Sequence, residues 1–360
     1  MGGNVATRRL LTLQRAVRLY RPSPRAIPLV AALTVVIAAC STATVTPTLS
    51  EVPTATSDPG TSVASSPSAA STQSPRPAVT SFTVPFESSD PAMVPGVLDV
   101  YSPASAGRWP VVVMFTPPGA LGDLLTQATR VAERGYLVFV PNWGIPAPGK
   151  TFDPTSREGM TAGDAQNACA VAFAESHAAD YGGDPSTIIV FGHSAGAMAG
   201  AGLAFAPGKP ATGCLGGGLR PVDALVTWEG DWLYSVAMWN DIFAADPTLV
   251  DDFSIWPMLP LRKNLKVDLL VGETSDMPDL PVADLAVRDP TGALRQQLSR
   301  NGALADGNIT IAESQRLLFS ALKAQGNPVT LEVMPESNHE YIVGAGWPVF
   351  LAAFDRVAGR

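Results

Sequence analysis

The sequence has few of the residues that metal and thiol chemistry require. It contains three cysteines and three histidines among 360 residues, and no two cysteines lie close together along the chain. Structural zinc sites use four such ligands, usually in closely spaced pairs, and a cysteine nucleophile needs a histidine partner. We therefore expect no metal ion, no cysteine nucleophile and no cofactor.

Positive charge is also scarce. The chain carries 24 lysines and arginines against 32 acidic residues, a net charge of −8. Six of the arginines fall in residues 1–39, which contain no acid, so a chain that begins at Cys40 has a net charge of −14. Binding to nucleic acid needs a basic patch, so this balance excludes nucleic acid as the natural partner. It also disfavours docking on anionic lipid through surface charge.

The N-terminus is an arginine-rich stretch followed by an apolar run from Ala26 to Ala39. This run has the length of a signal-peptide apolar region and is short for a transmembrane helix. It ends in Ile37-Ala38-Ala39-Cys40, which resembles the lipobox of bacterial lipoproteins. We expect a signal peptide over residues 1–39, a lipid on Cys40, and an exported protein anchored to the outer face of the bacterial membrane. The alternatives are an ordinary cleavage site, an anchor helix, or a twin-arginine signal at Arg8-Arg9.

Residues 40–80 are mostly serine, threonine, proline and alanine. Such a segment buries too little apolar surface to offset the entropy lost on folding, so we expect a disordered linker tethered at Cys40. The two cysteines beyond it, Cys169 and Cys214, would lie in an oxidising compartment, where an even pair favours a disulfide. The alternative is two buried thiols that pack as small apolar groups.

From residue 81 to residue 360, strand-like and helix-like segments alternate. We expect strands at 97–101, 111–115, 136–140, 187–191, 224–228, 267–271 and 329–333, and helices at 124–134, 162–181, 195–205, 314–325 and the C-terminus. This alternation predicts one α/β domain, a mainly parallel sheet flanked by helices. Residues 231–263 and 277–312 are expected to be insertions in this domain.

One pentapeptide carries most of the functional signal. Gly192-His193-Ser194-Ala195-Gly196 lies directly after a predicted buried strand and directly before a predicted helix. At such a joint the G-x-S-x-G pattern forces a tight turn that exposes the serine above the sheet, and the two glycines leave room for it. The position predicts that Ser194 is a nucleophile.

A serine nucleophile needs a base, and an acid that orients the base. His177 falls inside a predicted helix and His193 inside the pentapeptide, whereas His339 lies in a loop after the last predicted strand, where reactive groups are often found. We therefore expect His339 to be the base and Asp276, in the loop after strand 267–271, to be the acid. The alternative acids are Glu273, Asp279 and Asp231.

Together these segments resemble an α/β-hydrolase of the esterase and lipase type over nearly all of residues 95–358. The likeness is carried by Tyr181-Gly182-Gly183-Asp184-Pro185, Ile188 to Gly196, Gly272 to Asp276 and Asn338-His339, and by the order serine, acid, histidine along the chain. The resemblance implies cleavage of carboxylic esters through a Ser-His-Asp triad and an acyl-enzyme intermediate.

The same resemblance implies an oxyanion hole made of backbone N–H groups. Ala195 is the expected first donor. The second is expected from the loop Thr116-Pro117-Pro118-Gly119-Ala120, where the prolines have no N–H to give, so Ala120 is favoured, with Gly119 next. A Pro-Gly at this place is similar to cutinase-like polyesterases. The proline-bearing loop also motivates the alternative of a catalytically inactive, hydrolase-fold binding lipoprotein.

The sequence does not identify the ester substrate, since a small-molecule, lipid or polymer ester would each suit such a site. Trp143 and Trp232 are candidates for lining an acyl or aryl pocket. The segment from Gly144 to Thr151 matches the P-loop pattern, but Pro146 and Pro148 lack the N–H groups that hold phosphate. We therefore expect no nucleotide partner.

Overall fold

An eight-stranded sheet runs through this computed structural model, which describes residues 78–86, 96–118, 124–144, 153, 156–206, 214, 220–233, 248–275, 280–281 and 308–360. The strands are β1 (Val79–Phe86), β2 (Gly96–Pro103), β3 (Trp109–Phe115), β4 (Leu137–Asn142), β5 (Gly183–His193), β6 (Ala224–Trp228), β7 (Lys266–Gly272) and β10 (Val329–Met334). Their order is β1-β2-β4-β3-β5-β6-β7-β10. A separate antiparallel pair joins β8 (Leu280–Pro281) to β9 (Asn308–Ile309).

The sheet is mainly parallel, as the sequence predicts. Strand β2 pairs antiparallel with both β1 and β4, and every other pairing in the sheet is parallel. Most strand bounds agree with expectation, and β6 agrees to the residue. Strand β1 was not predicted, because most of its residues are exposed at the edge of the sheet and its sequence has no apolar run.

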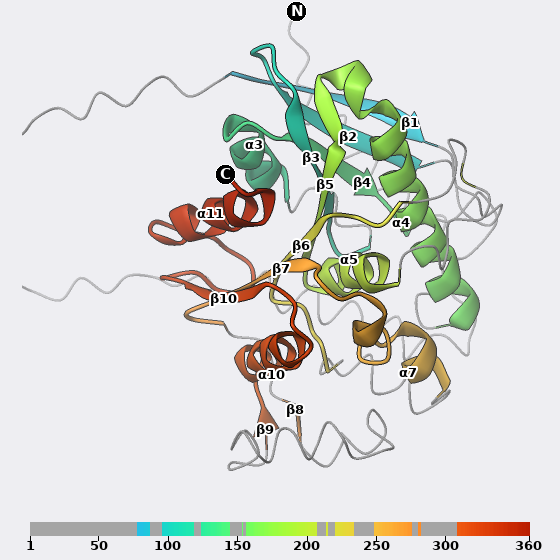
Figure 1. Cartoon of the computed structure of the whole chain (residues 1–360), viewed down its shortest axis with the longest axis vertical. Helices are drawn as coiled ribbons and strands as arrows, with labels where there is room; N and C mark the ends of the chain where they lie inside the picture. Colours follow the sequence, from blue (N-terminus) through green and yellow to red (C-terminus); the bar gives the residue numbers. More distant parts are fainter. Residues whose placement is uncertain are drawn as a thin grey trace, which may run out of the picture. The chain divides into compact units, whose positions relative to one another are not determined.

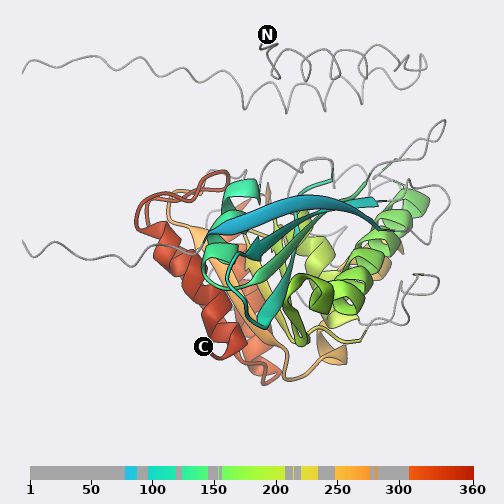
Figure 2. The same ribbon diagram turned by 90° about the horizontal axis from the view of Figure 1, so that it is seen from above.

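Helices cover both faces of the sheet (Figures 1 and 2). They are α3 (Leu125–Glu133), α4 (Arg157–His177), α5 (Ala195–Phe205), α7 (Thr248–Phe253), α10 (Ile311–Ala324) and α11 (Gly346–Ala358), with 3₁₀ turns η2 (Ala178–Tyr181) and η3 (Leu259–Leu261). The two apolar cores place α3 and α11 on one face and α4, α5 and α10 on the other. Among the described helices, none is long and apolar enough to cross a bilayer.

Helix α4 begins five residues before its predicted start. Ser156 caps it, because its hydroxyl oxygen accepts a hydrogen bond from the Gly159 N–H at 3.0 Å, which satisfies one of the N–H groups left free at a helix start. The predicted end is also corrected, since the α-helix stops at His177 and the chain continues as a 3₁₀ turn.

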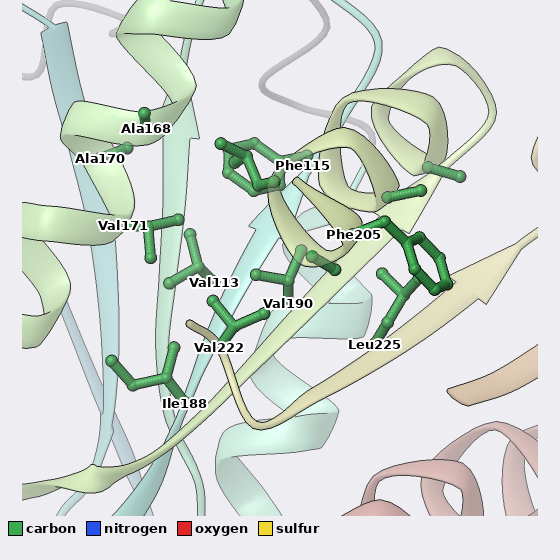
Figure 3. Close-up of a cluster of buried hydrophobic side chains, with 14 of the residues drawn as sticks. Val113, Phe115, Ala168, Ala170, Val171, Ile188, Val190, Phe205, Val222 and Leu225 are labelled. Atoms are coloured by element: carbon green, nitrogen blue, oxygen red, sulfur yellow. The ribbon is translucent and has the colours of Figure 1, made fainter. Parts of the chain in front are cut away.

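The core between the sheet and α4 and α5 is built from apolar side chains of the strands and of these two helices (Figure 3). The strands contribute Val113, Phe115, Ile188, Val190 and Leu225, and the helices contribute Ala168, Ala170, Val171 and Phe205. Small residues let α5 approach closely. A Cβ on Gly200 would lie 2.8 Å from a Val190 methyl group, so a larger residue there would force the helix away.

The two cysteines of the described domain form a disulfide. Cys169 on α4 is bonded to Cys214, 45 residues further along the chain. The predicted pairing is therefore confirmed. Cys40 and the predicted linker up to residue 77 lie outside the described residues, so the expected signal peptide, linker and lipid attachment stay predictions.

A buried ion pair joins the sheet to the C-terminal helix, and its loss should destabilise the protein. Asp268 on β7 has no exposed side-chain surface and accepts two hydrogen bonds from Arg356 on α11, at 2.7 and 3.1 Å, and one from Thr330 at 2.8 Å. Asp268→Asn removes the charge from these bonds. We expect the free energy of unfolding in urea to fall by about 1.5–3 kcal/mol, the usual value of a hydrogen bond to a charged group. The loss should not exceed this value, because the partly exposed side chain of Arg356 can turn toward water.

Arg108→Gln is the matched control. Arg108 and Asp184 form an ion pair at 3.3 Å, but the arginine side chain is largely exposed, and such surface pairs contribute little to stability. If the free energy of unfolding fell equally in the two variants, burial of the pair between Asp268 and Arg356 would contribute nothing to stability.

Candidate active site

The strands β5, β6, β7 and β10 are parallel neighbours, so their C-terminal ends meet at one edge of the sheet. The loop after each strand carries a polar residue of the site. Ser194 follows β5, Glu229 follows β6, Ser275 lies beyond β7, and His339 lies beyond β10. Ligand sites of open α/β sheets form at this edge.

Ser194 lies at a sharp turn between β5 and α5. Its backbone has φ 54° and ψ −124°, a conformation that costs a non-glycine residue of order 1–3 kcal/mol. The flanking glycines make the turn possible. A Cβ on Gly192 would lie 2.3 Å from the Gly196 carbonyl oxygen, and one on Gly196 would lie 2.2 Å from the Phe115 carbonyl oxygen. This is the turn that the pentapeptide predicts.

The turn is fixed to the neighbouring strand. The Ser194 N–H donates to the Trp228 carbonyl at 3.1 Å. Ala195 is the first residue of α5, where the N–H groups have no acceptor within the helix. The role of Ala195 as a donor to an oxyanion stays a prediction.

The loop that carries His339 is held by several hydrogen bonds. Thr274, beyond β7, donates both its N–H and its hydroxyl to the Ser337 carbonyl, at 2.9 and 3.1 Å. The Asn338 side-chain oxygen accepts the N–H groups of Glu340 and Tyr341. These bonds give the histidine a defined position, with 13% of its side chain exposed.

The imidazole of His339 is paired with a buried carboxylate. Its Nδ1 lies 2.8 Å from Oε2 of Glu229, whose side chain has no exposed surface. The same carboxylate accepts the Gly272 N–H at 2.6 Å and the Ser275 hydroxyl at 2.9 Å. Because a carboxylate only accepts, the His339 proton must be on Nδ1. That leaves Nε2 free to take a proton.

Glu229 was not among the acids selected from the sequence. The expected acid, Asp276, and the alternative Asp279 lie outside the described residues. The alternative Glu273 is exposed and accepts the Glu336 N–H at 2.9 Å. An imidazole has a single Nδ1–H, and Glu229 accepts it in this structure.

A signal for Glu229 was present in the sequence. It follows strand 224–228 directly, just as Ser194 follows its own strand. We expected the acid in the loop after the next strand, 267–271, and after strand 224–228 Asp231 was preferred to Glu229. The structure places Asp231 among the buried residues and gives the contact with His339 to Glu229.

The loop that carries Glu229 is held by a second buried side chain. Glu229 has φ 49°, a strained value for a non-glycine residue. Gln315 on α10 donates to the Gly230 carbonyl at 2.6 Å and accepts the Trp232 indole N–H at 2.7 Å. Trp256 donates its own indole N–H to the Trp232 carbonyl at 2.9 Å. This network stabilises the strained loop in one conformation.

His193, directly before the nucleophile, is buried between two rings. Its imidazole stacks on Trp228 with ring centroids 4.1 Å apart, and it lies 4.8 Å from the ring of His339. Its Nε2 is 2.7 Å from the His339 carbonyl oxygen. Burial, and then the proximity of His339, lower the pKa of His193 to about 3, although its bond to the His339 carbonyl acts in the opposite direction. His193 is therefore neutral at physiological pH.

The expected second side of the oxyanion hole is only partly described. Thr116, Pro117 and Pro118 are visible, whereas Gly119 and Ala120 lie outside the described residues. Trp143 is buried, and its indole N–H donates to the Thr116 carbonyl at 2.9 Å. It therefore holds the start of this loop. Its predicted contact with substrate stays a prediction.

Trp232 also packs into the interior. Its side chain is buried, and both its indole N–H and its carbonyl take part in the network around Gln315. The structure thus gives this tryptophan a role in supporting the loop after β6. Lining of a substrate pocket by Trp232 stays a prediction, because most of the insertion at 231–263 that precedes α7 lies outside the described residues.

No cluster of three or more histidine, cysteine or acidic side chains suited to a metal ion occurs in the described part of the chain.

The fold agrees with that of solved esterase structures. An esterase of the Planctomycetes species Thermogutta terrifontis has a TM-score of 0.51 at 17% identity, over 78% of this chain and 91% of that one. A bacterial heroin esterase has a TM-score of 0.50 at 18% identity, over 78% and 84%. T. terrifontis esterase 2 phosphoramylated by tabun has a TM-score of 0.50 at 16% identity, over 78% and 93%.

No family model and no curated protein matches the sequence. At identities this low, structural similarity establishes the fold and leaves the reaction to be argued from the site. The strand order, the turn at Ser194 and these structural neighbours agree: the chain has the α/β-hydrolase fold.

Proposed function

We propose that this protein is a serine hydrolase of carboxylic esters, with Ser194 as nucleophile, His339 as base and Glu229 as the acid that orients the base. The observation that carries the proposal is the hydrogen bond between the His339 Nδ1 and a fully buried carboxylate. The serine at the strained turn directly follows His193, whose ring centroid lies 4.8 Å from that of His339. A nucleophile, a base and a third group that orients the base form the pattern of activated serine enzymes.

In the proposed reaction, the Ser194 oxygen attacks the ester carbonyl carbon while its proton passes to Nε2 of His339. The tetrahedral intermediate collapses, the bond to the alkoxy oxygen breaks, and the leaving alcohol takes the proton from His339. Water then attacks the acyl-enzyme in the same way and releases the acid. The buried charge of Glu229 stabilises the imidazolium that forms in both steps.

The negative charge on the carbonyl oxygen needs fixed N–H donors. We assign the first to Ala195, at the start of α5, and the second to Ala120 or Gly119. A small-molecule ester is the favoured substrate class, since the structural neighbours above are named as esterases. No metal or nucleotide is needed in this scheme.

Labelling with a fluorophosphonate tests this proposal. An activated serine attacks phosphorus and displaces fluoride, forming a stable phosphonyl-enzyme, and a structural neighbour was solved as an adduct with tabun. We expect stoichiometric labelling that peptide mass spectrometry assigns to Ser194, together with hydrolysis of a short-chain nitrophenyl ester that the label abolishes. A folded protein that is neither labelled nor active would favour the binding lipoprotein considered above.

We also propose that the protein is exported and held at the outer face of the membrane by a lipid on Cys40. The signal-like sequence before Cys40 supports this, and so does the Cys169–Cys214 disulfide, because structural disulfides form mainly in oxidising compartments.

Cys40→Ser should release the protein from the membrane. We expect the wild-type protein in a bacterial host to sediment with membranes and to incorporate labelled palmitate. The variant should lose the label and shift to the soluble fraction, because serine has no sulfur atom to form the thioether bond that attaches the lipid. A variant that remains fully membrane-bound would contradict the proposed anchor. Esterase activity per molecule should be the same in both proteins, since the linker separates Cys40 from the domain.

A further inference from the structure

We propose that His193 is a positioning residue that fixes the distance between the nucleophile and the base through its hydrogen bond to the backbone carbonyl of His339. The inference rests on the proposed function and adds a residue to it. From the sequence, His193 was noted only as a residue of the pentapeptide that was not chosen as the base.

The hydrogen bond has a single reasonable direction. A carbonyl oxygen only accepts, so the 2.7 Å contact requires the proton of His193 to be on Nε2. Its Nδ1 is then a bare acceptor, and this atom is buried without a hydrogen-bond partner among the described residues. A buried polar atom without a partner has a cost, so the ring is held in this orientation by its contacts and by the bond at Nε2.

Two adjacent strand ends together hold the base at two points. His193 ends β5 and contacts the backbone of His339, while Glu229 follows β6 and contacts the His339 ring. His193 and Trp228 are direct partners across these two strands. The His193 bond therefore sets where the main chain of the base lies, and the Glu229 bond sets how its ring is turned.

The nucleophile is fixed to the same unit. Ser194 is covalently adjacent to His193, and its N–H donates to the carbonyl of Trp228, the residue on whose ring His193 stacks. The Cα atoms of His193 and Ser194 are about 3.8 Å apart across a trans peptide. One dipeptide thus carries the attacking hydroxyl and also holds the main chain of its base.

This arrangement should affect the chemical step more than binding. A displacement of about 1 Å between reacting groups can lower a rate by about 100-fold, whereas ground-state binding of the ester depends on the pocket. Loss of the donor at residue 193 is therefore expected to lower kcat by about 10–100-fold and to change KM by less than about twofold.

Three substitutions test separately the contributions of the N–H donor and of the aromatic ring of His193. His193→Phe keeps an aromatic ring on Trp228 but removes the donor. His193→Gln removes the ring but keeps an N–H at a similar distance along the side chain, and His193→Asn has a donor one bond too short to reach the His339 carbonyl. We expect low kcat in the Phe and Asn variants, and recovery to within about fivefold of the wild-type kcat in the Gln variant, since the hydrogen bond is restored.

The control variant must also lose a hydrogen bond from a buried side chain to a main-chain carbonyl, but at a place away from the site. Asn327 is buried and donates to the carbonyls of Arg262 and Leu265, just before β7 begins and so at the opposite end of that strand from the site. Asn327→Leu should lower stability and leave kcat at the wild-type value.

The experiment measures kcat and KM for a nitrophenyl ester, and the rate of fluorophosphonate labelling at Ser194, in the full-length wild-type protein and the four variants. A folded His193→Phe variant with wild-type kcat and labelling rate would overturn the inference alone. Should that variant not fold, the Asn and Gln variants decide, because equal kcat values in the two would equally overturn it. A wild-type protein with neither activity nor labelling would overturn the proposed function and this inference with it.

A spectroscopic measurement gives a second, independent readout. Long-range ¹H–¹⁵N spectra distinguish the two neutral histidine tautomers. We expect His193 to show the proton on Nε2 from pH 5 to 8, since burial lowers its pKa to about 3. A proton on Nδ1, or titration in that range, would contradict the proposed hydrogen bond.

Discussion

Replacing Ser194 with alanine should lower kcat for a short-chain ester by about 10⁴-fold or more. Removing the nucleophile of a serine triad leaves only the contribution of substrate binding and the oxyanion hole. The Ser275 hydroxyl is not expected to take its place, since it donates to Glu229. The measurement is kcat with a nitrophenyl acetate or butyrate, together with fluorophosphonate labelling, which should disappear.

The same position offers a test of the strained turn that does not depend on activity. Ser194 has φ 54°, a region that glycine populates freely and alanine does not. Both Ser194→Ala and Ser194→Gly should be inactive, but the glycine variant should be more stable than the alanine variant by about 1 kcal/mol in urea unfolding. Equal stabilities would mean that the turn is not strained in solution.

Replacing Glu229 with glutamine should lower kcat by about 10⁴-fold, the loss seen when the acid of a triad is neutralised or removed. The amide keeps the shape of the side chain but loses the charge that stabilises the imidazolium of His339. It also lets an N–H group face Nδ1, which favours the wrong tautomer. The measurement is kcat at several pH values, with far-UV circular dichroism to confirm folding, since Glu229 also accepts bonds from Gly272 and Ser275.

Two matched substitutions identify which acid acts. Glu273→Gln makes the same chemical change at the next strand end, on a carboxylate that accepts the Glu336 N–H, and kcat should stay within about threefold because uncoupled surface changes have small effects. Asp276→Asn tests the acid expected from the sequence. A 100-fold loss in Asp276→Asn with an active Glu229→Gln would return the acid role to Asp276.

Local sequence was sufficient to place the proposed nucleophile and the proposed base. A strand, a G-x-S-x-G turn and a helix follow one another without a gap, so the conformation at Ser194 is set by neighbouring residues, and helix α5 begins and ends where expected. The position of His339 beyond the last strand could likewise be predicted from chain order. The α/β architecture followed from the alternation of buried strands and helices.

The acid could not be chosen in this way. Glu229 and His339 are 110 residues apart, and the sequence offers an acidic residue in the loops after several strands. Which of them reaches the histidine depends on the order of β6, β7 and β10 in the sheet and on the strained backbone at Glu229. Strand β1 was missed for a related reason, since an exposed edge strand is stabilised by pairing with β2 and needs no apolar run.

The sequence by itself determined the alternation of strands and helices and the serine at the strand-to-helix turn, and it favoured the pairing of the two cysteines, because these depend on local conformation or on a choice among very few residues. Only the tertiary structure decided that Glu229 contacts the imidazole of His339, that Gln315 supports the loop of that acid, and that His193 contacts the backbone of the base. These contacts form between strand ends and helices distant along the chain. The hydrogen bonds that select them exist only once the sheet has brought those ends together.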